Sequence, residues 1–251
     1  MTPSRVALVT GSGKKRIGSH VASLLAERGY AVIVHYHTSA AEAAETVEQL
    51  QRHHIEALAL QANLADETAV QGLFENARAR FGRLDVFVHC VGLWRTGRLE
   101  DVRAADVRQH FQVNVLSTFL CAREAGLTMI RQPEGGCIIT LGDWAEARPY
   151  VNYAAYFASK GAIPAMTRCL AVELGTRNPR VRVNCILPGP VMLPPDLSAE
   201  ERRESIASTL VQREGSPDHI ARAVVSLIEN DFITGVSLPV DGGRTIYAGG
   251  T

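Results

Sequence analysis

The sequence predicts one α/β domain, a doubly wound Rossmann-type fold with a parallel seven-stranded sheet and helices on both faces. Three observations predict it. Short apolar runs alternate with amphipathic segments along residues 1–251. The apolar runs are nearly continuous, as expected for strands that helices cover on both faces. No linker, internal repeat or low-complexity segment interrupts the alternation, so we expect a single domain.

The expected elements follow from apolar runs that are bounded by turn residues. The seven expected strands are Arg5–Thr10, Ala31–Tyr36, Ile55–Gln61, Leu84–Val91, Cys137–Leu141, Val181–Leu187 and Val236–Val240. Helices are expected to end near Arg28, His53, Arg80, Ile130 and Arg177. A last helix is expected to open at Ser216-Pro217-Asp218, which supplies a cap and a proline for its first turn.

The composition bears on the partners and the compartment of the protein. Lysine plus arginine and aspartate plus glutamate number 26 each, so no net charge attracts nucleic acid or a membrane surface. No apolar run approaches the ~18 residues of a membrane span, and the N-terminus resembles no secretory signal. Five scattered cysteines indicate reduced thiols, and no metal-ligand spacing is present. We expect a cytoplasmic protein without a metal.

The turn after the first strand has the pattern of a dinucleotide-binding loop. The segment Gly11–Gly18 lies between a strand and a helix, where backbone N–H groups can hold a pyrophosphate. A tight turn that merely needs glycine is the alternative. The second strand ends in His35–Ser39, without the acidic residue that binds the ribose 2′-hydroxyl of NAD. Lys14, Lys15 and Arg16 therefore favour the 2′-phosphate of NADPH, with a solvated basic loop as the alternative.

A tyrosine and a lysine have the spacing of a catalytic pair. In a helix, Tyr156 and Lys160 lie one turn apart on one face. The ammonium group is expected to lower the pKa of the phenol, which makes it a proton donor and acceptor near neutral pH. Asp143, which follows the fifth strand, could join them. The alternative is an amphipathic helix with Asp143 as a loop cap.

The positions of the candidate residues favour the catalytic interpretation. Doubly wound folds bind ligands beyond the carboxyl ends of their strands. The residues that end or follow strands are Gly11–Gly18, His37–Ser39, Gly92, Asp143 and Pro188–Pro190. We therefore expect one site at this edge of the sheet.

Together these motifs resemble the short-chain dehydrogenase/reductase family over essentially the whole chain. The matching segments are Thr10-Gly11…Gly18, Asn63-Leu64, Asn114, Tyr156-x-x-x-Lys160, Pro188-Gly189 and Asp241-Gly242-Gly243. The resemblance implies that Tyr156 exchanges the substrate proton, that Lys160 lowers its pKa and binds the nicotinamide ribose, and that Asn114 helps to hold a proton-relay water. It implies a homotetramer or a dimer, and a cofactor site formed by Gly11, Arg16, Ile17, Gly18, His37, Thr38, Ser39, Asn63, Leu64, Val91, Gly92, Lys160, Pro188 and Gly189.

Departures from the usual family pattern resemble the pteridine reductase branch, which includes dihydromonapterin reductases. Arg16 stands where the family usually has glycine, and Asp143 where it usually has serine. The segment His35–Ala43 is similar to the one that binds the NADPH phosphate in that branch. The resemblance implies that Trp94 stacks on a pterin and that residues 191–213 form a substrate lid. The implied substrate residues are Arg16, Trp94, Asp143, Tyr156 and Leu193.

The leading hypothesis is therefore an NADPH-dependent reductase of a pterin or dihydropteridine, with Asp143 and Tyr156 supplying the proton to a ring nitrogen. A carboxyl group can relay that proton while it bonds ring N–H or amino groups. A carbonyl reductase of the 3-oxoacyl-thioester or sugar type is the second hypothesis, since one fold hosts many activities. A non-catalytic NADP(H)-binding regulator is the third, and the intact Tyr156/Lys160 pair argues against it.

Overall fold

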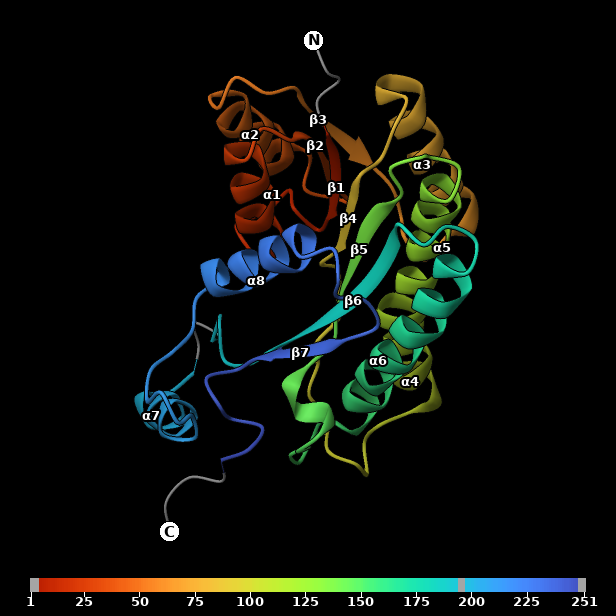
Figure 1. Ribbon diagram of the computed structural model, residues 1–251. Coiled ribbons are helices and arrows are strands. Elements are labelled where there is room, and N and C mark those ends of the chain that lie inside the picture. Colours follow the sequence, from red (N-terminus) through yellow and green to blue (C-terminus); the bar gives the residue numbers. More distant parts are fainter. Residues whose placement is uncertain (1–4, 194–196, 248–251) are drawn as a thin grey trace.

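The computed structural model describes residues 5–193 and 197–247 and confirms the expected doubly wound sheet (Figure 1). Seven parallel strands lie in the order β3-β2-β1-β4-β5-β6-β7. The order reverses between β1 and β4, where such sheets bind their ligands. The strands are β1 (Val6–Thr10), β2 (Ala31–Tyr36), β3 (Ala57–Gln61), β4 (Val86–His89), β5 (Gly136–Leu141), β6 (Val181–Pro188) and β7 (Ser237–Val240).

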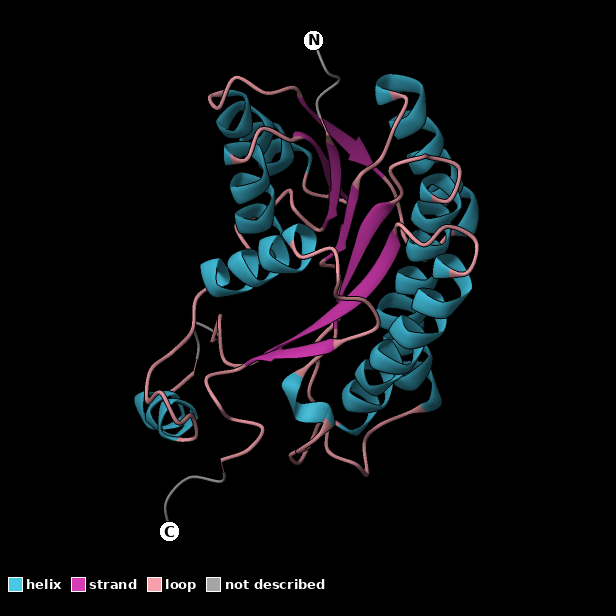
Figure 2. Cartoon of the chain, in the orientation of Figure 1, coloured by secondary structure: helices cyan, strands magenta, loops and turns pink. Residues whose placement is uncertain are grey.

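Helices cover both faces of this sheet (Figure 2). One layer contains α1 (Ile17–Glu27), α2 (Ala40–Gln51) and α8 (Pro217–Glu229). The other contains α3 (Glu67–Phe81), α4 (Ala104–His110), α5 (Ser117–Met129) and α6 (Ala154–Gly175). The short helix α7 (Ala199–Ala207) lies away from the sheet, beside the end of β7.

Each face of the sheet buries its own apolar cluster. Val9 and Ile139 belong to the cluster on the side of α1 and α8, whereas Leu8 and Ile138 belong to the cluster on the side of α3 and α5. Successive side chains of a strand point to opposite faces. Because both faces are buried, nearly every strand residue must be apolar, which explains the continuous apolar runs of the sequence.

Most expected strands differ by one or two residues at an end, and three segments differ more clearly. The helix expected over Ala104–Ile130 is divided, since a π-helical segment η1 (Phe111–Leu116) separates α4 from α5. A π turn inserts an extra residue, which a 3.6-residue period does not reveal. The fourth strand is shorter than Leu84–Val91, because its pairing with both neighbours ends at His89. The insertion 191–213 contains a regular helix, α7, and its residues 194–196 lie outside the described residues.

Candidate active site

Asp143 and Tyr156 form the centre of the site. Asp143 follows β5 and caps a 3₁₀ turn, η2 (Trp144–Glu146), because its Oδ1 accepts a hydrogen bond from the N–H of Ala145 at 2.9 Å. Its Oδ2 accepts the hydroxyl proton of Tyr156 at 2.7 Å. Asp143 is thus both the loop cap and the partner of the tyrosine, so the two interpretations that the sequence left open both apply.

The electrostatics of this pair correct one expectation from the sequence. Burial, and then the charge and hydrogen bond of Asp143, raise the pKa of Tyr156 well above its ordinary value. The lowering that we expected from Lys160 is therefore wrong for this arrangement, because the carboxylate holds the proton on the phenol. Burial also raises the pKa of Asp143, against the hydrogen bond from Tyr156 and the charges of Lys160 and Arg244.

Lys160 lies beneath the loop that follows β4. Its ammonium group is buried and donates a hydrogen bond to the carbonyl oxygen of Leu141 at 2.9 Å. Burial lowers the pKa of Lys160, and the charge of Asp143 opposes that effect. A Cβ atom added at Gly92 would lie 3.4 Å from Lys160 Nζ. Lys160 therefore reaches the segment where the resemblance places the cofactor, with ammonium protons left over for a ribose hydroxyl.

Asn114 joins three parts of the site from within η1. Its Oδ1 accepts from the N–H of Leu93 at 2.6 Å, and its Nδ2 donates to the Leu93 carbonyl at 3.0 Å and to Ser159 Oγ at 2.8 Å. The side chain thereby ties the loop after β4 to helix α6, close to Lys160. Since these contacts occupy its amide, its observed role is to position the loop, and the water-holding role remains a prediction.

A cavity of about 410 Å³ lies at the carboxyl ends of β1, β2 and β4. The predicted cofactor residues that line it are Gly11, Arg16, His37, Thr38, Ser39, Asn63, Leu64, Val91 and Gly92. Ile17, Gly18, Lys160, Pro188 and Gly189 do not line it. Sequence reasoning missed Val113 and Ser117, which line the cavity from η1 and α5. They lie one residue before and three residues after Asn114, and this proximity was the available signal.

The loop between β1 and α1 fits a pyrophosphate. Gly11 has a φ of +63°, in the left-handed region that favours glycine. A Cβ atom at Gly18 would lie 2.7 Å from the Gly11 carbonyl oxygen, so the first turn of α1 packs directly against the loop. This close packing presents the helix N-terminus to the cavity, where its N–H groups and dipole favour an anion.

Two buried histidines support the floor of this cavity. The ring of His89 lies between Thr10 Oγ1 and Ser117 Oγ, at 3.2 Å from each. Burial lowers the pKa of His89 to about 3. His35 Nδ1 accepts from the N–H of Gly11 at 3.1 Å, and burial lowers the pKa of His35 to about 4. Both rings are neutral at pH 7, so they hold the loops by hydrogen bonds alone.

An aromatic row extends from the catalytic pair. Trp94, the predicted substrate platform, is 47% exposed and stacks on Tyr153 with ring centroids 5.1 Å apart. Tyr153 packs edge to face on Tyr150, and Tyr150 stacks on Trp144 at 6.1 Å. Sequence reasoning missed Tyr150 and Tyr153, although their spacing of six and three residues from Tyr156 was visible. Leu193, the other predicted substrate residue, hydrogen-bonds through its N–H to Glu214 at 3.1 Å.

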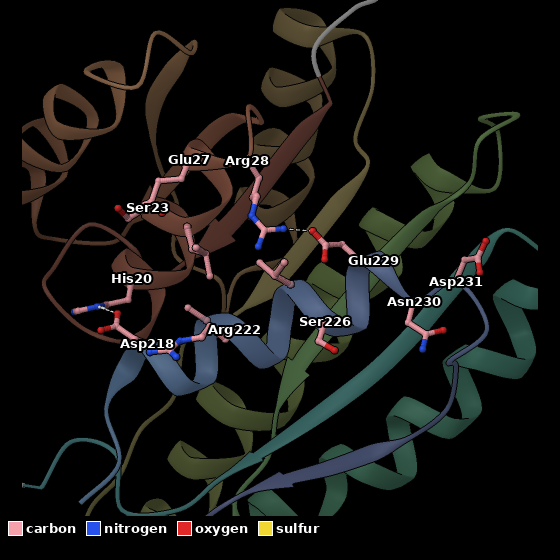
Figure 3. Close-up of a pocket in the computed structure, with 13 residues that line it drawn as sticks. His20, Ser23, Glu27, Arg28, Asp218, Arg222, Ser226, Glu229, Asn230 and Asp231 are labelled. Atoms are coloured by element: carbon pink, nitrogen blue, oxygen red, sulfur yellow. Dashed lines mark hydrogen bonds and ion pairs between the residues drawn. The ribbon is translucent and has the colours of Figure 1, made fainter.

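Another cavity lies away from this site. It measures about 900 Å³ and runs between α1 and α8 (Figure 3). Its walls carry ion pairs between the two helices, His20 with Asp218 and Arg28 with Glu229. None of Asp143, Tyr156, Lys160 and Asn114 lines it, so it is separate from the candidate active site.

Across residues 5–193 and 197–247, no three His, Cys, Asp or Glu side chains are placed to hold a metal ion. Among the helices of those residues, none has the length and apolar character needed to cross a membrane.

Known proteins resemble the whole chain. The family model described as "Enoyl-(Acyl carrier protein) reductase" matches residues 11–245. Versicolorin reductase stcU of Emericella nidulans is 34% identical over 257 residues, which cover 95% of each chain. The acetoin dehydrogenase structure from Enterobacter cloacae has a TM-score of 0.88 at 32% identity and covers 98% of each chain. A short-chain dehydrogenase/reductase from Serratia marcescens has a TM-score of 0.88, 32% identity and coverage of 98% of this chain and 100% of its own.

These matches agree with the site geometry. The tyrosine, lysine and asparagine of the family pattern lie together beside a dinucleotide loop in a sheet of the family's topology. The chain belongs to the short-chain dehydrogenase/reductase family and is an oxidoreductase of that family, which uses a nicotinamide cofactor.

Proposed function

We propose that the protein is an NADPH-dependent reductase of a pterin or dihydropteridine. The observation that carries the proposal is the 2.7 Å hydrogen bond from Tyr156 to Asp143, at a position where serine is usual in the family. A serine hydroxyl suits a carbonyl oxygen, whereas a carboxyl group can relay a proton to a ring nitrogen and bond its N–H groups.

The electrostatics of the pair suit reduction of a C=N bond. Asp143 and burial hold the hydroxyl proton on Tyr156, and burial favours the protonated form of Asp143 as well. The site thus keeps a proton for the nitrogen that becomes basic as hydride reaches the adjacent carbon. The bound cofactor supplies that hydride, and Lys160 balances the charge of Asp143 during the transfer.

The aromatic row supports a flat substrate. Trp94 and Tyr153 lie nearly parallel, with 19° between their rings. Stacking on such a platform is worth about 0.5–1.5 kcal/mol beyond the buried area. Trp94 is half exposed, so it has surface left for a ligand.

The residues at the end of β2 support NADPH. His37, Thr38 and Ser39 line the cavity together with Lys14 and Arg16, and no carboxylate of the residues that the structure describes lines it. Lys14 pairs with Glu42 at 3.7 Å, but both side chains are about half exposed, so this pair is weak. We expect tighter binding of NADPH than of NADH, and Arg16→Ala should narrow that preference in a fluorescence titration of both cofactors.

The direct test is NADPH oxidation with dihydrobiopterin, dihydromonapterin and dihydrofolate. We expect turnover with at least one of them, and Tyr156→Phe should abolish it. Asp143→Asn keeps the shape of the side chain but removes its acid, so it should lower kcat far more than it raises KM. No turnover with any of the three compounds would refute the pterin assignment.

The relatives favour a second candidate, a carbonyl reductase. The names of two of them, versicolorin reductase and acetoin dehydrogenase, point to other substrates than pterins. For this candidate, acetoacetyl thioesters or simple ketones are turned over by the wild type. Asp143→Ser, which restores the residue usual in the family, should raise that activity.

We also propose a homotetramer. Large apolar side chains are exposed along η1, α5 and α6, namely Phe111, Leu116, Phe119 and Val172, with exposed fractions of 39%, 41%, 41% and 66%. Exposed apolar surface on adjacent helices is typical of an interface. Light scattering should give four times the 27.2 kDa of the chain.

A further inference from the structure

Arg244 lies over the ring of Trp144, the residue that follows Asp143, and outside every motif that the proposed function uses. It follows the turn after β7, where Asp241 accepts hydrogen bonds from the N–H of Gly243 at 2.9 Å and from the N–H and hydroxyl of Thr245 at 2.6 Å each. These bonds fix the turn. The side chain of Arg244 then extends over the ring of Trp144, with Cζ 4.3 Å from its centroid.

The guanidinium group is electrostatically part of the site. Its charge is one of the effects that lower the pKa of Asp143, and burial lowers its own pKa while Asp143 and Tyr150 oppose that effect. Arg244 Nη1 donates to Ser205 Oγ of α7 at 3.0 Å. The group is therefore held between the aromatic row and helix α7 of the 191–213 insertion.

A second guanidinium group lies close to it. Arg148 Nη1 donates to the carbonyl oxygen of Arg244 at 2.8 Å and to that of Tyr247. The charge of Arg148 lowers the pKa of Arg244. Within residues 5–193 and 197–247, neither arginine takes part in an ion pair. The charges of Asp143 and Asp241 oppose the effect of Arg148, but neither carboxylate forms an ion pair with either arginine. Two like charges in a partly buried place therefore favour a further anion.

We infer that Arg244, supported by Arg148, is a specificity-determining residue that selects substrates with a carboxylate. Arg244 has four N–H donors besides the one bonded to Ser205, in a planar fork that matches a carboxylate. This inference rests on the proposed function for the reacting ring and adds a charged group to the substrate. Among the pterins named above, dihydrofolate carries carboxylates and dihydrobiopterin carries none.

The experiment compares kcat/KM for these two compounds in the wild type and in Arg244→Gln. We expect the wild type to prefer dihydrofolate, and the variant to lose roughly 10- to 100-fold with dihydrofolate, mainly through KM, as expected for one charge-assisted contact. With dihydrobiopterin the change should stay below about threefold. Arg244→Lys should recover part of the loss.

Ser205→Ala is the matched control, because it removes the bond to α7 and keeps the charge of Arg244. We expect it to retain the preference for the carboxylate. Two results would overturn the inference. Arg244→Gln could lower kcat/KM equally for both compounds, or Ser205→Ala could lower it as much as Arg244→Gln does. Either result would show that Arg244 only stabilises the structure.

The proposed function can fail separately, if neither pterin is reduced. Acetoacetate and acetoin then serve as the anionic and neutral pair for the carbonyl candidate, with the same variants. A wild type without preference for the anionic member of either pair also overturns the inference.

Discussion

The neutral histidine under the cofactor cavity gives a quantitative prediction about stability and pH. His89 is 1% exposed, and burial lowers its pKa to about 3. In the unfolded chain the ring takes up a proton below pH ~6.5. Between these two values only the unfolded state binds the proton, so the free energy of unfolding falls as the pH falls. At pH 5 the loss from this one residue is about 2 kcal/mol, since 1.5 pH units at about 1.4 kcal/mol each separate pH 5 from 6.5.

The variant His89→Asn removes this dependence. An amide can accept from Thr10 and donate to Ser117 as the ring does, so the variant should fold. We expect its unfolding free energy to drop by about 2 kcal/mol less than that of the wild type when the pH is lowered from 7.5 to 5. Urea denaturation at both pH values and one protein concentration measures the difference.

The effect of His89 is seen only when the pH dependence of the wild type is compared with that of His89→Asn, because other groups also titrate in this range. Burial and the charge of Asp143 raise the pKa of Glu146 to about 7, and this group acts with the opposite sign. The folded state then binds its proton more readily, so its contribution is lost as the pH rises through about 4.5 to 7. His53→Asn, at an exposed histidine, keeps the histidine count equal and should follow the wild type. Parallel pH profiles for wild type and His89→Asn would refute the reasoning.

Three further substitutions test contacts of the fold by thermal and urea unfolding. Asn114→Ala removes three hydrogen bonds, so it should lower the free energy of unfolding by about 2–4 kcal/mol and also lower kcat. An unchanged stability would contradict the role of Asn114 in linking the loop after β4 to α6. Arg182→Met removes the donor that bonds three carbonyl oxygens near the end of α8, and it should lower the free energy of unfolding by about 2–4 kcal/mol. A decrease of less than about 0.5 kcal/mol would contradict this role of Arg182. Gly126→Ala, whose Cβ atom would lie 2.4 Å from Leu174, should cost about 1–3 kcal/mol, whereas Gly72→Ala, with open space around it, should not destabilise.

The fold could be predicted because its determinants are local. Continuous apolar strands, glycine turns and helix caps are all visible along the chain, and the parallel order follows from their alternation. The π segment around Asn114 could not be predicted in the same way. The side chain of Asn114 bonds Leu93 and Ser159, which are 21 and 45 residues away, and such contacts exist only in the folded chain.

The sequence predicts which residues meet at the site where their spacing along the chain determines it. It does not predict the pKa values, which depend on the folded surroundings of each group. Lys160 and Asp143 were found from spacing, and the cavity contains nine of the predicted cofactor residues. The direction of the pKa of Tyr156 was not found, because it depends on which oxygen receives its proton. Arg244 carried no signal, since it meets Trp144 only after the chain has formed β6, α8 and β7.

The geometry around Asp143 bears on the direction of catalysis. An oxidising enzyme of this kind needs a phenolate at Tyr156 to accept a proton, and the adjacent carboxylate opposes that charge. Reduction needs the reverse, a phenol that holds its proton until the substrate nitrogen becomes basic. Burial raises the pKa of Asp143, whereas Lys160 and Arg244 lower it. Its Oδ2 accepts the hydrogen bond that keeps Tyr156 protonated. After Tyr156 has given its proton to the substrate nitrogen, a protonated Asp143 can return a proton to the phenolate. The same two cations then stabilise the buried carboxylate that remains.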